Sequence, residues 1–284
     1  MAASSISSAC GARNSFALMD ALAAFKEKQK DTWSFFAPLE ALTTGPAGQL
    51  VKFAGVASGQ RVLDVACGTG VVAITAARRG AQVSGLDLTP PLLDRARENA
   101  AIAGVPIEWR QGDAEALPYD DGAFDVVLSQ FGHMFAPRPA LAVAEMLRVL
   151  KPGGTLAFST WPPELFIGRM FILFSRFMPP PPVDVAPPPL WGEPSVVRER
   201  LGNAVSGLTF DRGRMLVPAM SVEHHRTMNE RTAGPVVKLI EMLAATDPTR
   251  LEQFRGEYLD LVRDYYEDNI VRCDYLMTRA TKNG

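Results

Sequence analysis

One acidic residue followed by two closely spaced glycines is the pattern in this sequence best suited to binding a ligand. Asp64 lies in the apolar run 62–65, and Gly68 and Gly70 precede an Ala-rich segment with helical spacing. This order predicts a strand, a tight turn and a helix, the first βα unit of a doubly wound sheet. Such sheets bind ligands outside the carboxyl ends of their strands. Because glycine has no Cβ, a ligand can approach the backbone closely at Gly68 and Gly70.

Two classes of cofactor use this geometry, and the charge of Asp64 distinguishes them. Residues 68–73 satisfy the G-x-G-x-x-G/A pattern of dinucleotide sites, in which a pyrophosphate sits on the helix N-terminus. A pyrophosphate would meet the Asp64 carboxylate without a neutralising charge. S-adenosylmethionine has no phosphate and carries an ammonium and a sulfonium. Asp64 therefore favours S-adenosylmethionine, and an NAD-dependent oxidoreductase remains the less favoured alternative.

Asp87 is the second acidic residue with a role in this prediction. It ends the short apolar segment 82–86, which predicts the second strand. A carboxylate at this place can accept hydrogen bonds from both ribose hydroxyls of an adenosine. Both cofactor classes contain ribose, so Asp87 indicates adenosine binding without choosing between them.

Five segments, in order, resemble the motifs of class I S-adenosylmethionine-dependent methyltransferases. The resemblance is to the small-molecule branch that includes the ubiquinone and menaquinone methyltransferases, and it covers about residues 50–161. The segments are 62–70, 85–89, 111–118, 124–129 and 145–154. A lone glycine pair is weak evidence, whereas five ordered matches are specific.

The resemblance implies S-adenosylmethionine as cofactor, with S-adenosylhomocysteine as its product. It implies that Asp113 accepts a hydrogen bond from the adenine amino group and that the Ala114 amide contacts a ring nitrogen. A non-catalytic protein that binds S-adenosylmethionine would carry the same motifs. The expected cofactor-binding residues are Asp64, Ala66, Gly68, Gly70, Asp87, Leu88, Asp113, Ala114 and Ser129.

The resemblance also implies the fold, an α/β Rossmann-like seven-stranded mixed sheet of order 3-2-1-4-5-7-6 with helices on both faces and a helical cap. Only the first five strands are predicted from the residues themselves. The expected parts are a flexible N-terminus (1–19), an N-terminal helical lid (20–55), a cofactor-binding core (56–161), a cap and acceptor region that includes strand 6 (162–268), and a last core strand (269–284).

The loop after the predicted fourth strand should face the methyl group of the donor. Gln130 and His133 are the first polar side chains that an acceptor would meet there. His133 could act as a general base for an acceptor that must lose a proton, or it could be a packed neutral histidine. Trp33 and Trp161 could contact the acceptor or pack in the core. We expect methyl transfer by in-line displacement, which requires no covalent protein nucleophile.

The acceptor is expected to be a small, hydrophobic or aromatic molecule. The segment 164–178 is rich in Phe and Met, and it would suit such a ligand, although the same residues could form core or the face of a homodimer. His224 and His225 are adjacent, so they cannot share one helix face, and a solvated surface pair is expected.

Composition narrows the remaining classes. The formal net charge of −2 and the absence of a basic tail argue against a nucleic-acid partner. Three scattered cysteines fit a reducing compartment, and no Cys/His cluster has zinc-ligand spacing, so we expect a cytoplasmic protein without a metal. No segment reaches the roughly 18 to 20 apolar residues of a membrane span. Residues 1–19 contain five serines and one arginine, a composition shared by transit peptides and flexible N-termini.

Overall fold

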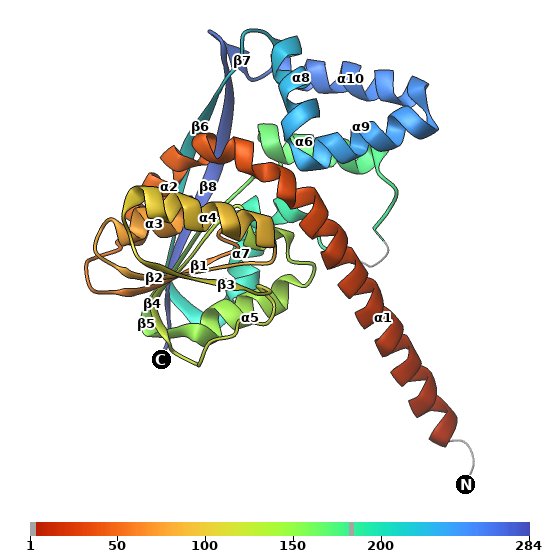
Figure 1. The fold of residues 1–284 in the computed structure, drawn as a ribbon. Helices are drawn as coiled ribbons and strands as arrows, with labels where there is room; N and C mark the ends of the chain where they lie inside the picture. Colours follow the sequence, from red (N-terminus) through yellow and green to blue (C-terminus); the bar gives the residue numbers. More distant parts are fainter. Residues whose placement is uncertain (1–3, 182–184) are drawn as a thin grey trace.

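A mixed β-sheet with helices on both faces forms the centre of the molecule (Figure 1). The computed structural model describes residues 4–181 and 185–284, with side chains from residue 18 onward. The strands are β1 (Arg61–Val65), β2 (Gln82–Asp87), β3 (Ile107–Gln111), β4 (Phe124–Gln130), β5 (Leu150–Thr160), β6 (Val205–Pro218), β7 (Tyr266–Glu267) and β8 (Ile270–Lys282).

The strand order is β3-β2-β1-β4-β5-β8-β6. Strands β1 to β5 are parallel, and β8 runs antiparallel to both β5 and β6. With β8 as the seventh long strand, this confirms the predicted order. The strand count is larger by one, because the described sheet also contains the two-residue β7, which pairs with β8. Asp268 and Asn269 both have positive φ (48° and 62°), as the two central residues of a type I′ hairpin turn require.

The helices divide between the two faces of the sheet and a cap. Helices α2, α3 and α4 cover one face, and α5 and α7 cover the other (Figure 1). The α-helices are α1 (Ser4–Trp33), α2 (Glu40–Ala54), α3 (Val71–Ala77), α4 (Pro90–Ala103), α5 (Pro139–Val149), α6 (Phe166–Phe177), α7 (Pro194–Leu201), α8 (Val222–Thr232), α9 (Gly234–Thr246) and α10 (Pro248–Arg263). Short 3-10 helices are η1 (Ser34–Leu39), η2 (His133–Phe135), η3 (Pro188–Gly192) and η4 (Gly202–Ala204).

Strand β1 shows how the sheet separates its two cores. Successive side chains of a strand point to opposite faces. Val62 therefore packs with α2 and α3, whereas Leu63 and Val65 belong to the other core, which includes α5. Asp64 consequently projects toward the face of α3, where it can meet the first turn of that helix.

Helices α6, α8, α9 and α10 form a cap beside one end of the long strands β6 and β8 (Figure 1). Aromatic side chains hold the cap together: Phe254 lies 5.5 Å from Phe174 and 5.8 Å from Tyr258 between ring centroids. The interval 162–268, expected as the cap, contains these helices together with α7, β6 and β7. Helix α7 packs on the sheet and lies outside the cap.

The N-terminal region differs in part from the expected lid. Residues 20–55 comprise the end of α1, η1 and α2, and Pro38 lies within η1 between the two longer helices. Helix α2 packs mainly on the core face, so in this region the end of α1 and η1 provide most of the cover over the carboxyl ends of the strands. Residues 4–19, expected to be flexible, continue α1, and residues 1–3 lie outside the described part.

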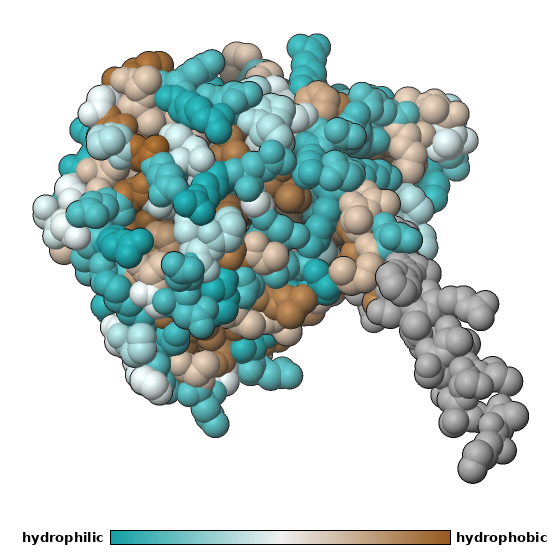
Figure 2. Space-filling view, turned by 60° about the horizontal axis from the view of Figure 1, so that its bottom comes forward, coloured by the Kyte–Doolittle hydropathy of each residue, from teal (hydrophilic) through white to brown (hydrophobic). Residues whose placement is uncertain are grey.

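The surface is mixed in polarity. Hydrophilic side chains spread over most of the face in Figure 2, and hydrophobic ones occur in separate areas between them, as on most folded domains. Among the described helices, none has the length and apolar character that a membrane crossing requires.

Gly168 fixes how closely α6 approaches the chain that leaves β5. A Cβ at this position would overlap the carbonyl group of Pro162 and come within 2.7 Å of Cα of Pro163. Both are backbone atoms, so α6 would have to move. We expect Gly168→Ala to lower the free energy of unfolding by about 1–3 kcal/mol in urea titrations.

Gly48→Ala in α2 is the matched control, because a Cβ at Gly48 would have no atom of the described chain within 4 Å. This change should stabilise the protein by about 0.5–1 kcal/mol, since it removes backbone freedom from a helix. Equal stability of the Gly168→Ala variant and the unmodified protein would contradict the close contact.

Candidate active site

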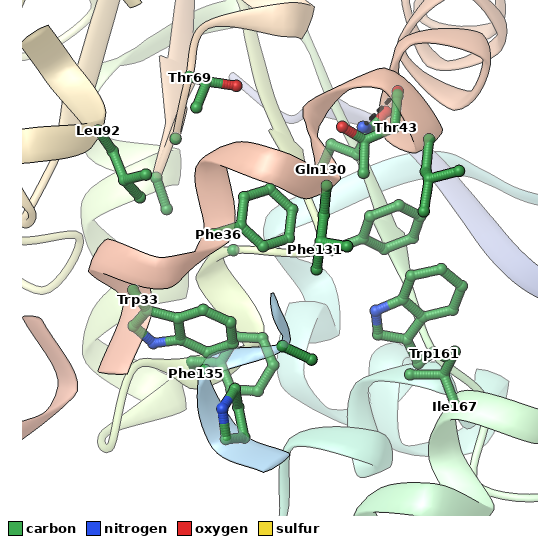
Figure 3. Close-up of a pocket in the computed structure, with 18 of the residues that line it drawn as sticks. Trp33, Phe36, Thr43, Thr69, Leu92, Gln130, Phe131, Phe135, Trp161 and Ile167 are labelled. Atoms are coloured by element: carbon green, nitrogen blue, oxygen red, sulfur yellow. Dashed lines mark hydrogen bonds between the residues drawn. The ribbon is translucent and has the colours of Figure 1, made fainter. Parts of the chain in front are cut away.

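A cavity of about 500 Å³ lies at the carboxyl ends of the strands, between the sheet, η1 and the cap. Figure 3 shows Thr69 and Leu92 on one side of it and Trp161 and Ile167 on the other, with Phe36 and Gln130 between them. The cavity therefore connects the glycine turn of the core to the helices of the cap. This volume lies within the usual range of ~300–1,000 Å³ for small-molecule sites.

Asp64 lies in the wall of this cavity with one carboxylate oxygen free. Its Oδ2 accepts a hydrogen bond from the backbone N–H of Ala73 (3.0 Å), and its Oδ1 has no partner within the described residues. The side chain is buried. Burial raises the pKa of Asp64 to about 8, and the negative charge of nearby Asp87 adds to this effect.

The turn after β1 places two of the expected residues on the cavity and turns the third away. Ala66 and Gly68 line the cavity, with φ of 54° and 55°. Gly70 does not: its Cβ position lies 2.6 Å from the ring of Trp109 and 3.2 Å from Cβ of Ala96. Gly70 is needed for its positive φ (83°) and for packing. The structure thus gives Gly70 a role in the shape of the turn, and its contact with the cofactor stays a prediction.

Asp87 joins the end of β2 to the glycine turn. Its Oδ2 accepts from the N–H of Gly68 (2.8 Å), and its Oδ1 accepts from the N–H of Thr89 (2.8 Å). Burial raises the pKa of Asp87, and these hydrogen bonds act in the opposite direction. Asp87 and Leu88 both line the cavity, where the sequence placed them.

Asp113 and Ala114 also line the cavity, and a lysine from α1 reaches this point. Nζ of Lys26 lies 2.5 Å from both Asp113 and the buried Glu115. Glu115 also pairs with Arg138, at 2.8 Å. This network attaches the C-terminal part of α1 to the loop that follows β3, across the cavity. Sequence reasoning missed Lys26, because no local pattern links it to a loop almost ninety residues later.

Gln130 and Ser129 are adjacent in β4 and so point to opposite faces of the sheet. Gln130 lines the cavity, donates to the carbonyl oxygen of Thr43 (3.0 Å; Figure 3), and its Oε1 lacks a partner among the described residues. The Ser129 hydroxyl instead donates to the carbonyl oxygen of Val65 (2.7 Å), fully buried behind the cavity wall. Ser129 thus links β4 to β1, and its contact with the cofactor stays a prediction.

His133 also lies behind the wall, which contradicts both its predicted acceptor contact and its predicted role as a base. The η2 turn directs it into the core between Phe158 and Trp191, whose rings lie 4.6 and 4.7 Å away. Neither ring nitrogen has a partner in the described part of the chain. Burial, together with the positive charge of Arg200, lowers the pKa of His133 to about 3. His133 is a packed neutral histidine.

Trp33 and Trp161, expected at the acceptor site, both line the cavity. Trp161 stacks on Phe131 with ring centroids 3.8 Å apart, and Trp33 lies 4.5 Å from Phe135 (Figure 3). The two aromatic pairs lie on opposite sides of the cavity in this view. They provide flat apolar surfaces of the kind that hold planar ligands.

The cap adds a polar pair that the sequence analysis did not select. His225 is buried and lines the cavity together with Asn229, one helical turn later on α8. His224 lines it as well, so the expected solvated histidine pair is wrong. The pattern His-x-x-x-Asn, with side chains on one helix face, is the signal that could have identified this pair.

Comparison with known proteins shows the family. A model described as "Methyltransferase domain" matches residues 63–158. An uncharacterized protein of Mycobacterium tuberculosis (Rv1405c) is 36% identical over 237 residues, which are 82% of this chain and 85% of that protein. Demethylmenaquinone methyltransferase of Thermus thermophilus is 42% identical over 125 residues, 42% of this chain and 57% of the relative.

The chain belongs to the class I S-adenosylmethionine-dependent methyltransferases.

Solved structures have the same fold. The YcgJ protein of Bacillus subtilis matches with a TM-score of 0.58 and 19% identity, covering 84% of this chain and 98% of that one. Phosphoethanolamine N-methyltransferase 2 of Haemonchus contortus, solved in complex with S-adenosyl-L-methionine, matches with a TM-score of 0.53 and 17% identity over 84% of this chain and 53% of its own.

As a member of this family, the methyltransferase uses S-adenosylmethionine as methyl donor, which decides against the NAD-dependent alternative that the glycine pattern left open. Among the side chains that the structure describes, in residues 18–181 and 185–284, no group of His, Cys, Asp and Glu is arranged to hold a metal ion.

The raised pKa of Asp64 gives a test of the cavity's electrostatics in the ligand-free methyltransferase. The unfolded chain titrates near 3.9, so the folded chain binds more protons between about pH 4 and 8. Stability that depends on this proton is present at low pH and is lost as pH rises through about 8. Asp64→Asn resembles the protonated form, so its free energy of unfolding should rise relative to the unmodified protein from pH 5 to 9.

Asp125→Asn is the control for this measurement. Asp125 pairs with Lys151, which lowers its pKa, so it stays ionised in both states over the same range. Its effect on the free energy of unfolding should not change from pH 5 to 9. If the difference in free energy of unfolding between Asp64→Asn and the unmodified protein also stayed constant from pH 5 to 9, the raised pKa of Asp64 would be contradicted.

Proposed function

We propose that this methyltransferase transfers the methyl group to an uncharged, apolar small molecule that lies between Trp161 and the cap. The donor would occupy the end of the cavity beside the glycine turn, and the acceptor the end beside α6 and α8. The observation that supports this proposal is the contrast between the two ends of the cavity. Acidic groups surround the donor end, and mostly apolar groups surround the acceptor end.

The residues at the first end suit S-adenosylmethionine. Asp64 presents a buried carboxylate oxygen that lacks a partner in the described structure, and a cationic group of the donor would satisfy it. We assign Asp87 to the ribose hydroxyls and Asp113 with Ala114 to the adenine ring. The Ala66 and Gly68 backbone would lie against the donor.

Lys26 must be considered in this assignment, because it already pairs with Asp113. Glu115 and Arg138 give Lys26 a second attachment that does not depend on Asp113. The Oδ1 of Asp113 accepts a hydrogen bond from the N–H of Glu115 (2.9 Å), so a contact within the same loop fixes the orientation of the Asp113 side chain. We propose that Lys26 holds α1 closed over the adenine.

The cap determines the class of acceptor. Among the described residues that line the cavity, the cap contributes no Lys, Arg, Asp or Glu side chain. A charged acceptor would be buried there without an opposite charge, which is costly. The apolar lining from the cap and the strands beneath it comprises Phe166, Ile167, Met170, Phe171, Phe174, Met215, Val217, Met228 and Val236.

This arrangement accounts for the chemistry with few specialised groups. When bound, S-adenosylmethionine supplies an electrophilic methyl group on a sulfonium. Asp64 and Asp87 would fix the donor end, and Trp161 with Phe131 would fix the plane of the acceptor, so that the two molecules meet in line. Loss of the sulfonium charge is favoured where water is excluded, and α1 and η1 cover the cavity from solvent.

The setting of the enzyme is also part of the proposal. Two described cysteines are buried and free, which supports a reducing, cytoplasmic location. The net charge of −2 supports the absence of a nucleic-acid partner. Homodimerisation stays a prediction of the apolar segment 164–178.

The experiment measures thermal stabilisation by S-adenosylhomocysteine, and then transfer of a labelled methyl group to a panel of planar apolar acceptors. A ligand at about 100 times its Kd adds roughly 2.7 kcal/mol to the free energy of unfolding. Asp87→Ala should weaken binding of S-adenosylhomocysteine by at least about tenfold, because it removes the acceptor of both ribose hydroxyls.

Each variant is compared with its own ligand-free form, since Asp87 also holds the turn through Gly68. The Asp125→Asn variant is the control: Asp125 lies at the amino-terminal end of β4, away from the cavity, so this variant should bind S-adenosylhomocysteine normally. Stabilisation of the Asp87→Ala variant equal to that of the unmodified protein would refute the assignment of Asp87. Transfer to phosphorylated or carboxylated acceptors in preference to uncharged ones would refute the acceptor class.

A further inference from the structure

One face of α8 lines the acceptor end of the cavity with regularly spaced residues. They are His225, Met228, Asn229 and Thr232, at positions i, i+3, i+4 and i+7. This spacing places them on a single helix face. Three of these side chains carry polar groups. The Thr232 hydroxyl donates to the carbonyl oxygen of Met228 (2.7 Å) on its own helix, so His225 and Asn229 are the polar pair on a wall that is otherwise mostly apolar.

The His225 ring is held rigidly. It stacks on Tyr258 of α10 at 6.1 Å between ring centroids, and it meets the edge of Phe166 at 5.7 Å. Its exposed fraction is 4%. Tyr258 is itself fully buried, and its hydroxyl points to the Met170 sulfur (3.8 Å). Contacts from α6 and α10 therefore fix the plane of the imidazole on α8.

Asn229 is attached to the same residue. Its Nδ2 donates to the carbonyl oxygen of His225 (2.9 Å) and lies 3.2 Å from Nε2 and 3.5 Å from Nδ1 of the ring. The amide and the imidazole thus form one polar pair in the wall. Both groups can donate and accept hydrogen bonds when neutral.

The pair carries no charge at neutral pH. Burial lowers the pKa of His225 to about 4, and the neighbouring His224 adds to this. Tyr258, which stacks on the ring, and Cys273, which lines the same cavity, are uncharged as well, because burial raises the pKa of each well above its usual value. A neutral polar pair in an apolar wall suits a ligand group that is polar but uncharged.

We propose that His225 and Asn229 form a subsite that binds a hydroxyl group on a planar, apolar acceptor, such as a phenol or an enol. This inference rests on the proposed function, since it describes one end of the acceptor position. A hydroxyl both donates and accepts, so it can use the imidazole and the amide together, and a low-dielectric wall strengthens such bonds. The subsite orients the ring relative to Trp161, and it selects hydroxylated acceptors over pure hydrocarbons of the same size.

The experiment uses 2-naphthol and 2-methylnaphthalene as probes, two fused-ring molecules of similar size that differ in the hydroxyl. Binding to the full-length protein saturated with S-adenosylhomocysteine is followed by quenching of tryptophan fluorescence, to which Trp161 and Trp33 in the cavity wall contribute. The unmodified protein should bind 2-naphthol roughly tenfold more tightly, as expected for one buried hydrogen bond between neutral groups.

His225→Ala should abolish this preference and leave the binding of 2-methylnaphthalene within about threefold. His225→Gln, which can still donate and accept, should restore part of the preference. Glu223→Gln, an exposed position on the same helix, should retain all of it. Asn229→Ala gives a second test at a position that is only half-buried, should the loss of His225 prevent folding.

The outcomes separate the two proposals. Equal affinity for the two probes in the unmodified protein, or an unchanged preference in the folded His225→Ala and Asn229→Ala variants, would overturn the subsite while leaving the apolar acceptor position in place. Failure of both probes to bind the unmodified protein would instead overturn the proposed acceptor position, and the subsite with it.

Discussion

Two buried carboxylates at the ends of adjacent parallel strands are the constraint on which the rest of the active site depends. Asp64 and Asp87 are almost fully buried, and the backbone supplies hydrogen bonds to three of their four carboxylate oxygens. Ala73 donates to Asp64, and Gly68 and Thr89 donate to Asp87. The glycine turn is therefore shaped by the carboxylates as much as by the cofactor it is built to meet.

Further contacts fix this turn from outside. Asn99 of α4 donates to the carbonyl oxygen of Thr69 (3.1 Å) and also to Glu40 (2.9 Å), the first residue of α2. Arg95 completes the group through an ion pair with Glu40 at 2.5 Å. Helices α2 and α4, which lie apart in the sequence, are thus joined to each other and to the glycine turn.

The donor end could be predicted because its determinants are local. Asp64, Asp87 and Asp113 lie within two residues of the carboxyl ends of β1, β2 and β3, and these ends meet at one edge of a parallel sheet. Gly70, Ser129 and His133 lie within a few residues of positions that line the cavity, yet they face the protein interior. Whether a residue in a turn or a short 3-10 helix faces the cavity or the protein interior depends on individual backbone dihedral angles. The spacing of motifs in the sequence does not determine these angles.

The acceptor end could not be predicted in the same way, because it is assembled from distant segments. The orientation of His225 depends on Tyr258, thirty-three residues further along the chain, and on Phe166 from α6. Lys26 reaches Asp113 from a helix that no core motif includes. Amphipathic patterns identify the cap helices, but they do not determine which helix face meets the cavity.

This difference explains how one fold can keep its donor and change its acceptor. The carboxylates and the turn belong to β1 and β2, and their hydrogen bonds are made within the core. The cap meets the core through the ends of β6 and β8 and through the α1 contact, so a change of side chain on α8 alters the cavity wall without altering any bond to Asp64 or Asp87. Acceptor specificity can therefore change on α6 and α8 at little cost to donor binding, whereas a change in the glycine turn affects both.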